Sequence, residues 1–275
     1  MITALLAEQL IWDIPHLVFT MMITCSYILY VKHNPPPSIK PLQPILFLVG
    51  IWLLYVMIGS PLLAFSYLSF SFHMIQMSFL FFIIPPLILL GIPERLYKKM
   101  EAFYLKWKMP AIIEPKIALI SFAILFLLYH LPNILSILTD YPILQKTYVI
   151  LLFLLSFRMV WPIASPNPRD RFLTEKRKKY LWQSSVYIMP ACMVFIISAL
   201  FGSMNNPFLG EVAAHLCLPA DRTIQVLPAP FNTKYDQMLA GFFMIGLHKI
   251  GLVVTCRLEK NVYKEIMKNE QICQE

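Results

Sequence analysis

The sequence predicts an all-α membrane protein, a bundle of seven transmembrane helices with the N-terminus outside and the C-terminus in the cytoplasm. Of its 275 residues, 58% are hydrophobic and only 14% are charged, whereas charged residues make up about a quarter of a typical soluble domain. The apolar residues gather into stretches long enough to cross a bilayer as helices. The net charge of +8 resides mainly in short loops between these stretches, a pattern that indicates membrane topology and no nucleic-acid partner.

Seven apolar stretches are long enough to span the membrane, and we expect them to form a single domain over residues 1–275. In chain order, the expected spans are about 16–31, 42–65, 69–91, 117–138, 143–163, 181–201 and 235–256. The first is the shortest and needs residues 11–15 to reach full length. The third carries no formal charge. Residues 257–275 are expected to form a cytoplasmic tail.

The basic residues set the predicted orientation. The loops after the first, third and fifth spans, together with the tail, hold 18 lysines and arginines, and the loops on the other side hold only Lys146, Arg222 and Lys234. Cytoplasmic loops of membrane proteins are enriched in lysine and arginine. The alternation therefore needs an odd number of spans, with the N-terminus outside the cell.

One cytoplasmic loop has a pattern of its own, because residues 94–108 are expected to form a short amphipathic helix on the inner leaflet. Its apolar residues fall at helical spacing with lysines between them: Leu96, Met100, Phe103, Tyr104 and Trp107. The expected role of this helix is anchoring. The basic run 169–179 predicts a solvated loop facing the lipid headgroups.

The sequence lacks the usual signatures of an enzyme or a disulfide-linked protein. There is no H-E-x-x-H, no G-x-S-x-G and no phosphate-binding glycine loop. The five cysteines are scattered and form no C-x-x-C pair, so they indicate no disulfide framework. No cleavable signal peptide is expected, because the N-terminus has no basic segment. We therefore expect a protein that is not an enzyme.

Polar side chains of four expected spans converge at the outer side of the membrane. The predicted topology brings to this level His16, His73, Gln76, Met77, His130, Asp236 and Gln237. Polar residues inside a membrane are costly and are candidates for function. His215 and Cys217 belong to the long loop above this level, and the sequence does not show whether they fold over it.

The residue types at this level favour copper. His73 and Met77 are four residues apart and share one helix face, and an imidazole with a thioether suits copper(I). The predicted metal ligands are His73, Met77, His130 and His16. The alternative is that the histidines only form hydrogen bonds between helices and the methionine only packs.

Three further polar residues are predicted to support the ligands. Gln76, Asp236 and Gln237 would fix a histidine tautomer by hydrogen bonding. For Asp236 an alternative is equally open: a carboxylate near the start of a helix caps free backbone N–H groups.

Six short motifs occur in order along the chain. They are W-D-I-P (12–15), S-F-H-M-I-Q-M (71–77), I-P-P-L-I-L-L-G-I-P (84–93), Y-H-L-P (129–132), W-P (161–162) and Y-D-Q-M-L-A-G (235–241). With these motifs and its seven-span layout, the sequence resembles the CtaG-type cytochrome c oxidase assembly factors of Gram-positive bacteria over most of its length.

The resemblance implies a multi-pass protein of the bacterial plasma membrane that helps to form an active haem–copper oxidase by delivering copper. It implies His73 and His130 as candidate copper ligands, with Asp236 and Gln237 as a supporting pair. The implied partners are the lipid bilayer, an oxidase subunit and an extracytoplasmic copper donor. The alternative function is a metal-free scaffold that stabilises an oxidase subunit during assembly.

The sequence departs from the family pattern at two places. The family commonly has a second histidine where this chain has Met77, and Arg158, Met159 and Val160 replace residues that usually precede the W-P pair. A methionine retains affinity for copper(I) and weakens binding of copper(II). The chain therefore either handles reduced copper or is a divergent paralogue whose metal role is reduced or lost.

Two other classes of seven-helix protein fit less well. A retinal protein would need Lys249 for the Schiff base, but that residue is expected near the inner end, and the third span has no acidic counter-ion. A transporter built from inverted repeats would show a matched pair of broken helices, which the sequence does not have.

Overall fold

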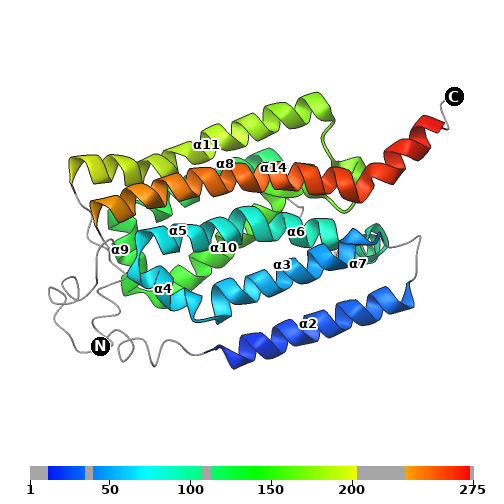
Figure 1. The fold of residues 1–275 in the computed structure, drawn as a ribbon, viewed down its shortest axis with the longest axis horizontal. Helices are drawn as coiled ribbons and strands as arrows, with labels where there is room; N and C mark the ends of the chain where they lie inside the picture. The colour runs from blue at the N-terminus through cyan, green and yellow to red at the C-terminus, as the bar shows by residue number, and fades with distance from the viewer. Residues whose placement is uncertain (1–11, 35–39, 107–112, 203–232, 273–275) are drawn as a thin grey trace.

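In the computed structural model, every regular element of the described residues is a helix (Figure 1). The described residues are 12–34, 40–106, 113–202 and 233–272. Six of the helices are long and apolar enough to cross a membrane, and a bent pair of shorter helices makes a seventh candidate span. The predicted all-α membrane bundle is therefore confirmed. Trp107, His215, Cys217 and Arg222 lie outside the described residues.

The elements follow one another along the chain with short connections. They are α2 (Ile14–His33), α3 (Leu42–Gly59), α4 (Leu62–Leu68), α5 (Phe70–Ser78), the π-helix η1 (Phe79–Ile83), α6 (Ile84–Gly91), α7 (Glu94–Lys106), α8 (Pro115–Tyr129), α9 (Pro132–Asp140), α10 (Pro142–Ala164), the 3₁₀-helix η2 (Pro168–Asp170), α11 (Thr174–Phe201) and α14 (Lys234–Ile272).

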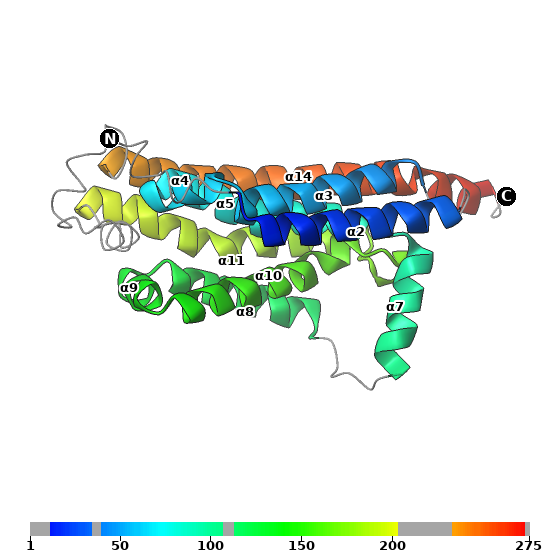
Figure 2. The ribbon, with the colours of Figure 1, turned by 90° about the horizontal axis from the view of Figure 1, so that it is seen from below.

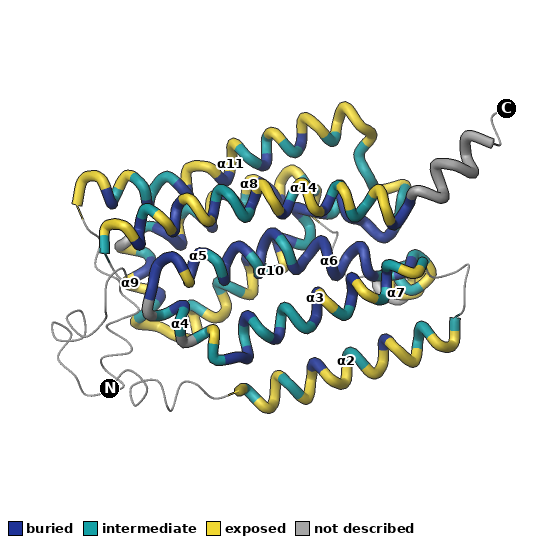
Figure 3. Tube along the Cα trace, viewed as in Figure 1, coloured by how far each residue is buried: buried dark blue, intermediate teal, exposed yellow. Residues whose placement is uncertain are grey.

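The third span is the centre of the bundle. Helices α5, η1 and α6 run on as one span, in which 83% of the most apolar stretch is buried, against 11% for α2. This central span packs against α3, α10 and α14, whereas α2 packs against α3 at the edge (Figures 1 and 3). Polar side chains of the third span are therefore shielded from lipid by the surrounding helices.

A π-helical turn in the middle of the third span follows from two prolines. Pro85 and Pro86 lack the N–H groups that would bond the carbonyls of Phe81 and Phe82 in an α-helix. The backbone widens instead, and the N–H of Ile84 bonds the carbonyl five residues earlier. Helix α14 approaches this turn closely at Gly251. A Cβ at that position would lie 2.8 Å from the carbonyl oxygen of Phe82.

The predicted span 42–65 is interrupted in the structure. Helix α3 ends at Gly59, Ser60 is extended, and a separate short helix, α4, follows. The break has a local cause, because the residue before a proline disfavours the α conformation and Pro61 follows Ser60.

The predicted span 117–138 is bent by 82° between α8 and α9. Leu131 is extended in front of Pro132, for the same steric reason. The bend leaves His130 as the residue that ends α8.

Two helices are longer at one end than the sequence predicts. Helix α11 begins at Thr174 rather than near residue 181, and α14 continues through residues 257–272, which were expected to form a tail. Both extensions lie at the same end of the bundle (Figure 1). Arg177 of the α11 extension bonds Glu259 of the α14 extension, so the helices stay in contact in a region too polar to be recognised by hydropathy.

The two ends of the bundle differ in charge. Helix α7 lies crosswise to the other helices at one end of the bundle, the end at which the C-terminal part of α14 lies (Figure 2). We call this the basic end, because it carries the basic loops. At the opposite end, called here the histidine end, lie α9, the start of α5 and the start of α14 (Figure 1). From the enrichment of cytoplasmic loops in lysine and arginine, we expect the basic end to face the cytoplasm.

Candidate functional site

The position of α5 at the histidine end is fixed by a side chain from α14. The carboxylate of Asp236 accepts hydrogen bonds from the backbone N–H groups of Phe70 (2.9 Å) and Ser71 (3.2 Å) and from the hydroxyl of Ser69 (2.8 Å). These N–H groups are the free donors of the first turn of α5. A carboxylate at a helix N-terminus also complements the helix dipole. Asp236 belongs to α14 and therefore caps α5, a helix that is distant from it in the sequence.

Two further bonds hold α5 in place. The hydroxyl of Ser71 donates to the backbone carbonyl of Asp236 (2.9 Å). The Nε2 of Gln76 donates to the carbonyl of Met57 (2.7 Å). That carbonyl is available because Pro61, four residues later, has no N–H to donate. Gln76 thus joins the central span to the end of α3.

His130 ends α8 with both backbone and side chain. Its N–H bonds the carbonyls of Leu127 and Leu128, which leaves the carbonyl of Phe126 available, and the ring Nδ1 lies 2.6 Å from that oxygen. A carbonyl only accepts, so Nδ1 carries the proton and Nε2 carries the lone pair. The Nε2 is buried and has no hydrogen-bond partner among the described residues.

The structure brings His73 and His130 into one aromatic cluster. Tyr129 stacks on His73 with 6.0 Å between ring centroids and an interplanar angle of 17°, and its ring centroid is 5.2 Å from that of His130. Phe195 of α11 lies 5.3 Å from His130 on another side. His73 is 3% exposed and His130 is 0% exposed. We call His73, Tyr129 and His130 the histidine cluster.

The other predicted ligands are placed differently. Met77 is buried on α5, one helical turn after His73. His16 is exposed at the start of α2, where its Nδ1 lies 2.8 Å from the carboxylate of Asp13. The backbone N–H of His16 also bonds this carboxylate and holds the pKa of Asp13 below its usual value. The structure therefore gives His16 a local pairing at the edge of the bundle.

Two of the three predicted supporting residues are deeply buried on α14. Asp236 is 3% exposed and Gln237 is 0% exposed. The carboxylate of Asp236 bonds the first turn of α5, the helix that carries His73. Within the described residues, no group of three or more His, Cys, Asp or Glu side chains is close enough to hold a metal ion. A metal at the histidine cluster would therefore be bound by the imidazoles of His73 and His130. The thioether of Met77 lies on α5, the same helix as His73.

Sequence reasoning missed two features of this site. It did not assign Tyr129 a role, although the residue stands inside the Y-H-L-P motif and its ring contacts both imidazoles. It also missed the serines that meet Asp236. Ser69 directly precedes α5, and a serine at this place is a sequence signal for a helix N-terminus. Its partner on α14, Asp236, was not recognisable from the local sequence.

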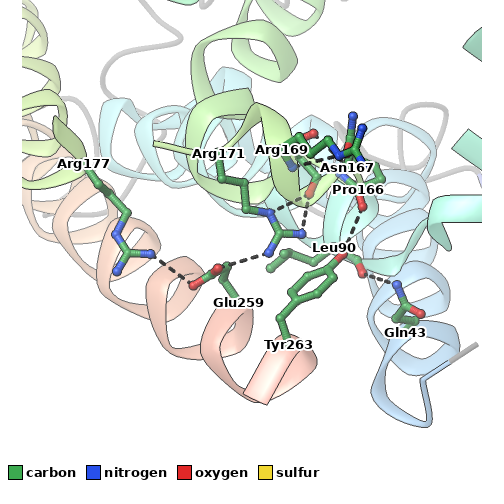
Figure 4. Close-up of polar contacts among 10 residues, drawn as sticks. Gln43, Leu90, Pro166, Asn167, Arg169, Arg171, Arg177, Glu259 and Tyr263 are labelled. Atoms are coloured by element: carbon green, nitrogen blue, oxygen red, sulfur yellow. Dashed lines mark hydrogen bonds and ion pairs between the residues drawn. The ribbon is translucent and has the colours of Figure 1, made fainter. Parts of the chain in front are cut away.

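A second polar cluster, also missed, lies at the basic end (Figure 4). Glu259 of α14 accepts hydrogen bonds from Arg171 (3.1 Å) and Arg177 (3.2 Å). The Arg171 guanidinium also donates to the carbonyl of Ser165 (2.8 Å) and stacks 3.5 Å over the ring of Tyr263. We call Arg171, Arg177, Glu259 and Tyr263 the arginine cluster. It fastens the connection between α10 and α11 to α14.

Comparison with known proteins gives one match. A family model described as the cytochrome c oxidase caa3 assembly factor (Caa3_CtaG) matches residues 26–258. The match includes the histidine cluster and, of the arginine cluster, Arg171 and Arg177; it ends one residue before Glu259. Neither the curated proteins nor the solved structures contain a match to the chain.

Proposed function

The chain belongs to the family of cytochrome c oxidase caa3 assembly factors, and on that premise we propose that it binds copper(I) at the histidine cluster and hands it to an oxidase subunit. The protein would act in the plasma membrane of a bacterium, with the histidine end facing outward. Its role would be assembly rather than catalysis. Copper would be its cargo, taken from an extracytoplasmic donor.

The observation that carries this proposal is the Nε2 of His130. A buried nitrogen lone pair without a hydrogen-bond partner among the described residues costs free energy in the folded protein. The same atom is ready to bind a metal, since the opposite ring nitrogen is held by a backbone carbonyl. Metal-binding histidines are typically oriented in this way.

The chemistry of the neighbouring residues fits reduced copper. Imidazole nitrogens and thioether sulfur are ligands that copper(I) accepts, whereas magnesium or calcium would need oxygen ligands. The rings of His73 and His130 both contact Tyr129, and Met77 follows His73 on α5. A site with few protein ligands leaves copper able to exchange with ligands of a partner, which is what delivery needs.

A metal-free scaffold remains a second candidate function, and a specific observation favours it. The described residues contain no cluster of three His, Cys, Asp or Glu side chains suited to a metal, and Met77 replaces a histidine common in the family. On this alternative, the protein would bind an oxidase subunit through its membrane helices. His130 would then act only as the cap of α8.

Complementation in cells distinguishes the two functions. In a strain that lacks its own copy of the factor, we would express the wild type, His130→Leu and His73→Leu, and measure oxidase activity and the copper content of the purified oxidase. Copper delivery predicts that both variants lower activity and oxidase copper together, while the variants still co-purify with the oxidase subunit. Full activity and full copper content in both variants would contradict copper delivery and support the scaffold.

A further inference from the structure

We propose that a groove between α11 and α14, at the basic end of the bundle, binds one anionic phospholipid. The groove is separate from the histidine cluster and from the arginine cluster. The proposal does not rest on copper delivery, because its residues and its ligand are different.

The groove lies on the outer surface of the bundle, where α11 and α14 pack side by side (Figures 1 and 2). It has a volume of about 420 Å³, and its apolar lining includes Leu181, Leu252 and Val253. A smaller hollow of about 140 Å³ lies beside it and shares Trp182, Ser185 and Lys249 as lining residues. Because this surface faces outward from a membrane bundle, the space is open to lipid.

Three cationic side chains line the same groove. They are Lys249, Arg257 and Lys260 of α14, which are spread over about 16 Å of the helix at 1.5 Å per residue. No acidic residue lines the groove, and no ion pair of the described residues includes any of the three. Arg171 and Arg177, by contrast, share the carboxylate of Glu259. The groove therefore combines apolar walls with three cationic side chains that form no ion pair among the described residues.

This combination matches a phospholipid better than a free anion. The apolar walls provide contact for an acyl chain, and the lysine and arginine side chains can extend along them to reach a headgroup phosphate. Basic pockets between membrane helices on the cytoplasmic side are suited to anionic headgroups. Trp182 is 68% exposed at the rim, and tryptophan prefers the headgroup level of a membrane. A zwitterionic headgroup would bring its own cation toward the three positive charges, so an anionic lipid is favoured.

The first test removes the charges. The purified protein in mild detergent would be titrated with dioleoylphosphatidylglycerol, and bound lipid would be counted by native mass spectrometry. The variant K249Q/R257Q/K260Q would be compared with R95Q/K116Q/K179Q, which removes the same charge from exposed basic residues outside the groove. We expect one tightly bound lipid in the wild type and in the control variant. In the groove variant, affinity should fall on the order of 100-fold.

The second test blocks the groove and keeps the charges. Ser185 lies next to Trp182 in both hollows, so Ser185→Phe should fill the space, whereas Ser185→Ala leaves it open. We expect lipid binding to be lost in Ser185→Phe and retained in Ser185→Ala. Thermal unfolding of each variant in phosphatidylcholine would confirm that it is folded.

Three results would overturn the proposal. An equal loss of binding in the control variant would show general surface attraction. Equal binding of dioleoylphosphatidylcholine would show that the basic residues do not select the headgroup. Equal competition by glycerophosphoglycerol, which has the headgroup without acyl chains, would show an anion site that does not use the apolar walls.

Discussion

The histidine cluster and the arginine cluster stand at opposite ends of the same bundle, and they use their polar groups in different ways. In the arginine cluster, one carboxylate is shared by two guanidinium groups, one of which also bonds a carbonyl and stacks on a tyrosine. In the histidine cluster, the Nε2 of His130 is buried without a hydrogen-bond partner among the described residues. The first arrangement satisfies its members, and the second leaves one buried atom with binding capacity.

This difference separates a structural role from a functional one. A buried network whose groups are paired stabilises one conformation. A buried polar atom left without a partner is destabilising, and native proteins keep such atoms where another role compensates. We therefore propose that the arginine cluster holds helices together and that the histidine cluster binds a ligand. Substitutions in and between the two clusters test this proposal, and their expected effects on stability decrease in the order given.

The largest effect is expected where the histidine cluster is supported. Asp236→Ala removes the acceptor of two backbone N–H groups and one hydroxyl, all buried. Leaving these donors unpaired should lower the free energy of unfolding by about 4 kcal/mol, at one to three per donor. Denaturant unfolding in detergent, followed by circular dichroism, measures it. Asp236→Asn keeps one acceptor oxygen and should lose less. An effect below about 1 kcal/mol in Asp236→Ala would show that α5 does not depend on this cap.

A slightly smaller effect is expected in the arginine cluster. Glu259→Ala leaves Arg171, whose side chain is 9% exposed, without its anion, and removing one partner of a largely buried ion pair costs about 3 kcal/mol. The same unfolding measurement applies, with Glu259→Gln as the milder control. Copper(I) affinity should be unchanged, because the cluster is at the other end of the bundle. A loss of copper(I) affinity in Glu259→Ala would contradict this separation and show that both clusters contribute to copper binding.

Between the clusters, close packing of α14 on the π-helical turn gives a third test. Gly251→Ala places a methyl group 2.8 Å from the carbonyl oxygen of Phe82, and such overpacking should cost about 2 kcal/mol. Gly246→Ala is the matched control, because nothing lies within 4 Å of its Cβ position. That variant should gain up to about 1 kcal/mol from helix propensity. Equal melting temperatures for the two variants would show that the close approach does not matter.

The smallest effect on stability is expected at His130 itself. His130→Leu removes a buried nitrogen that has no hydrogen-bond partner, which is favourable, and loses the bond to the Phe126 carbonyl, which is unfavourable. The two effects are of similar size, so the free energy of unfolding should change by less than about 1 kcal/mol. A loss of 3 kcal/mol or more, which is about the cost of breaking a paired buried charge, would show that His130 is structural in the way that Glu259 is.

Much of the fold is readable from the sequence, because the length of an apolar stretch is set by the thickness of the bilayer. The bend at His130 is less predictable. Pro132 indicates that a helix break is possible there, but a proline inside a membrane span can equally leave a single kinked helix. The extension of α14 beyond residue 256 depends on contact with α11 and on Glu259, and neither follows from hydropathy.

The candidate site shows a similar limit. Topology places a residue at a level along the membrane normal, but it does not say where around the bundle that residue lies. His16 and His73 were therefore expected together, and the structure places His16 at the edge beside α3, with Asp13 as its partner. His73 and His130 are brought together because His73 of α5 lies beside the end of α8, where the ring of Tyr129 contacts both imidazoles. Asp236 was expected to support a histidine or to cap a helix, and its bonds to α5 depend on the packing of α14 against α5.

The most direct test is an anaerobic copper(I) titration of the purified protein in detergent against a competing chelator. The wild type, His73→Ala/His130→Ala and Glu259→Gln would be compared. Copper(I) delivery predicts tight binding of about one copper per chain in the wild type and in Glu259→Gln, and its loss in the double variant. No competitive binding by the wild type, or equal binding by the double variant, would contradict the assignment of copper to the histidine cluster.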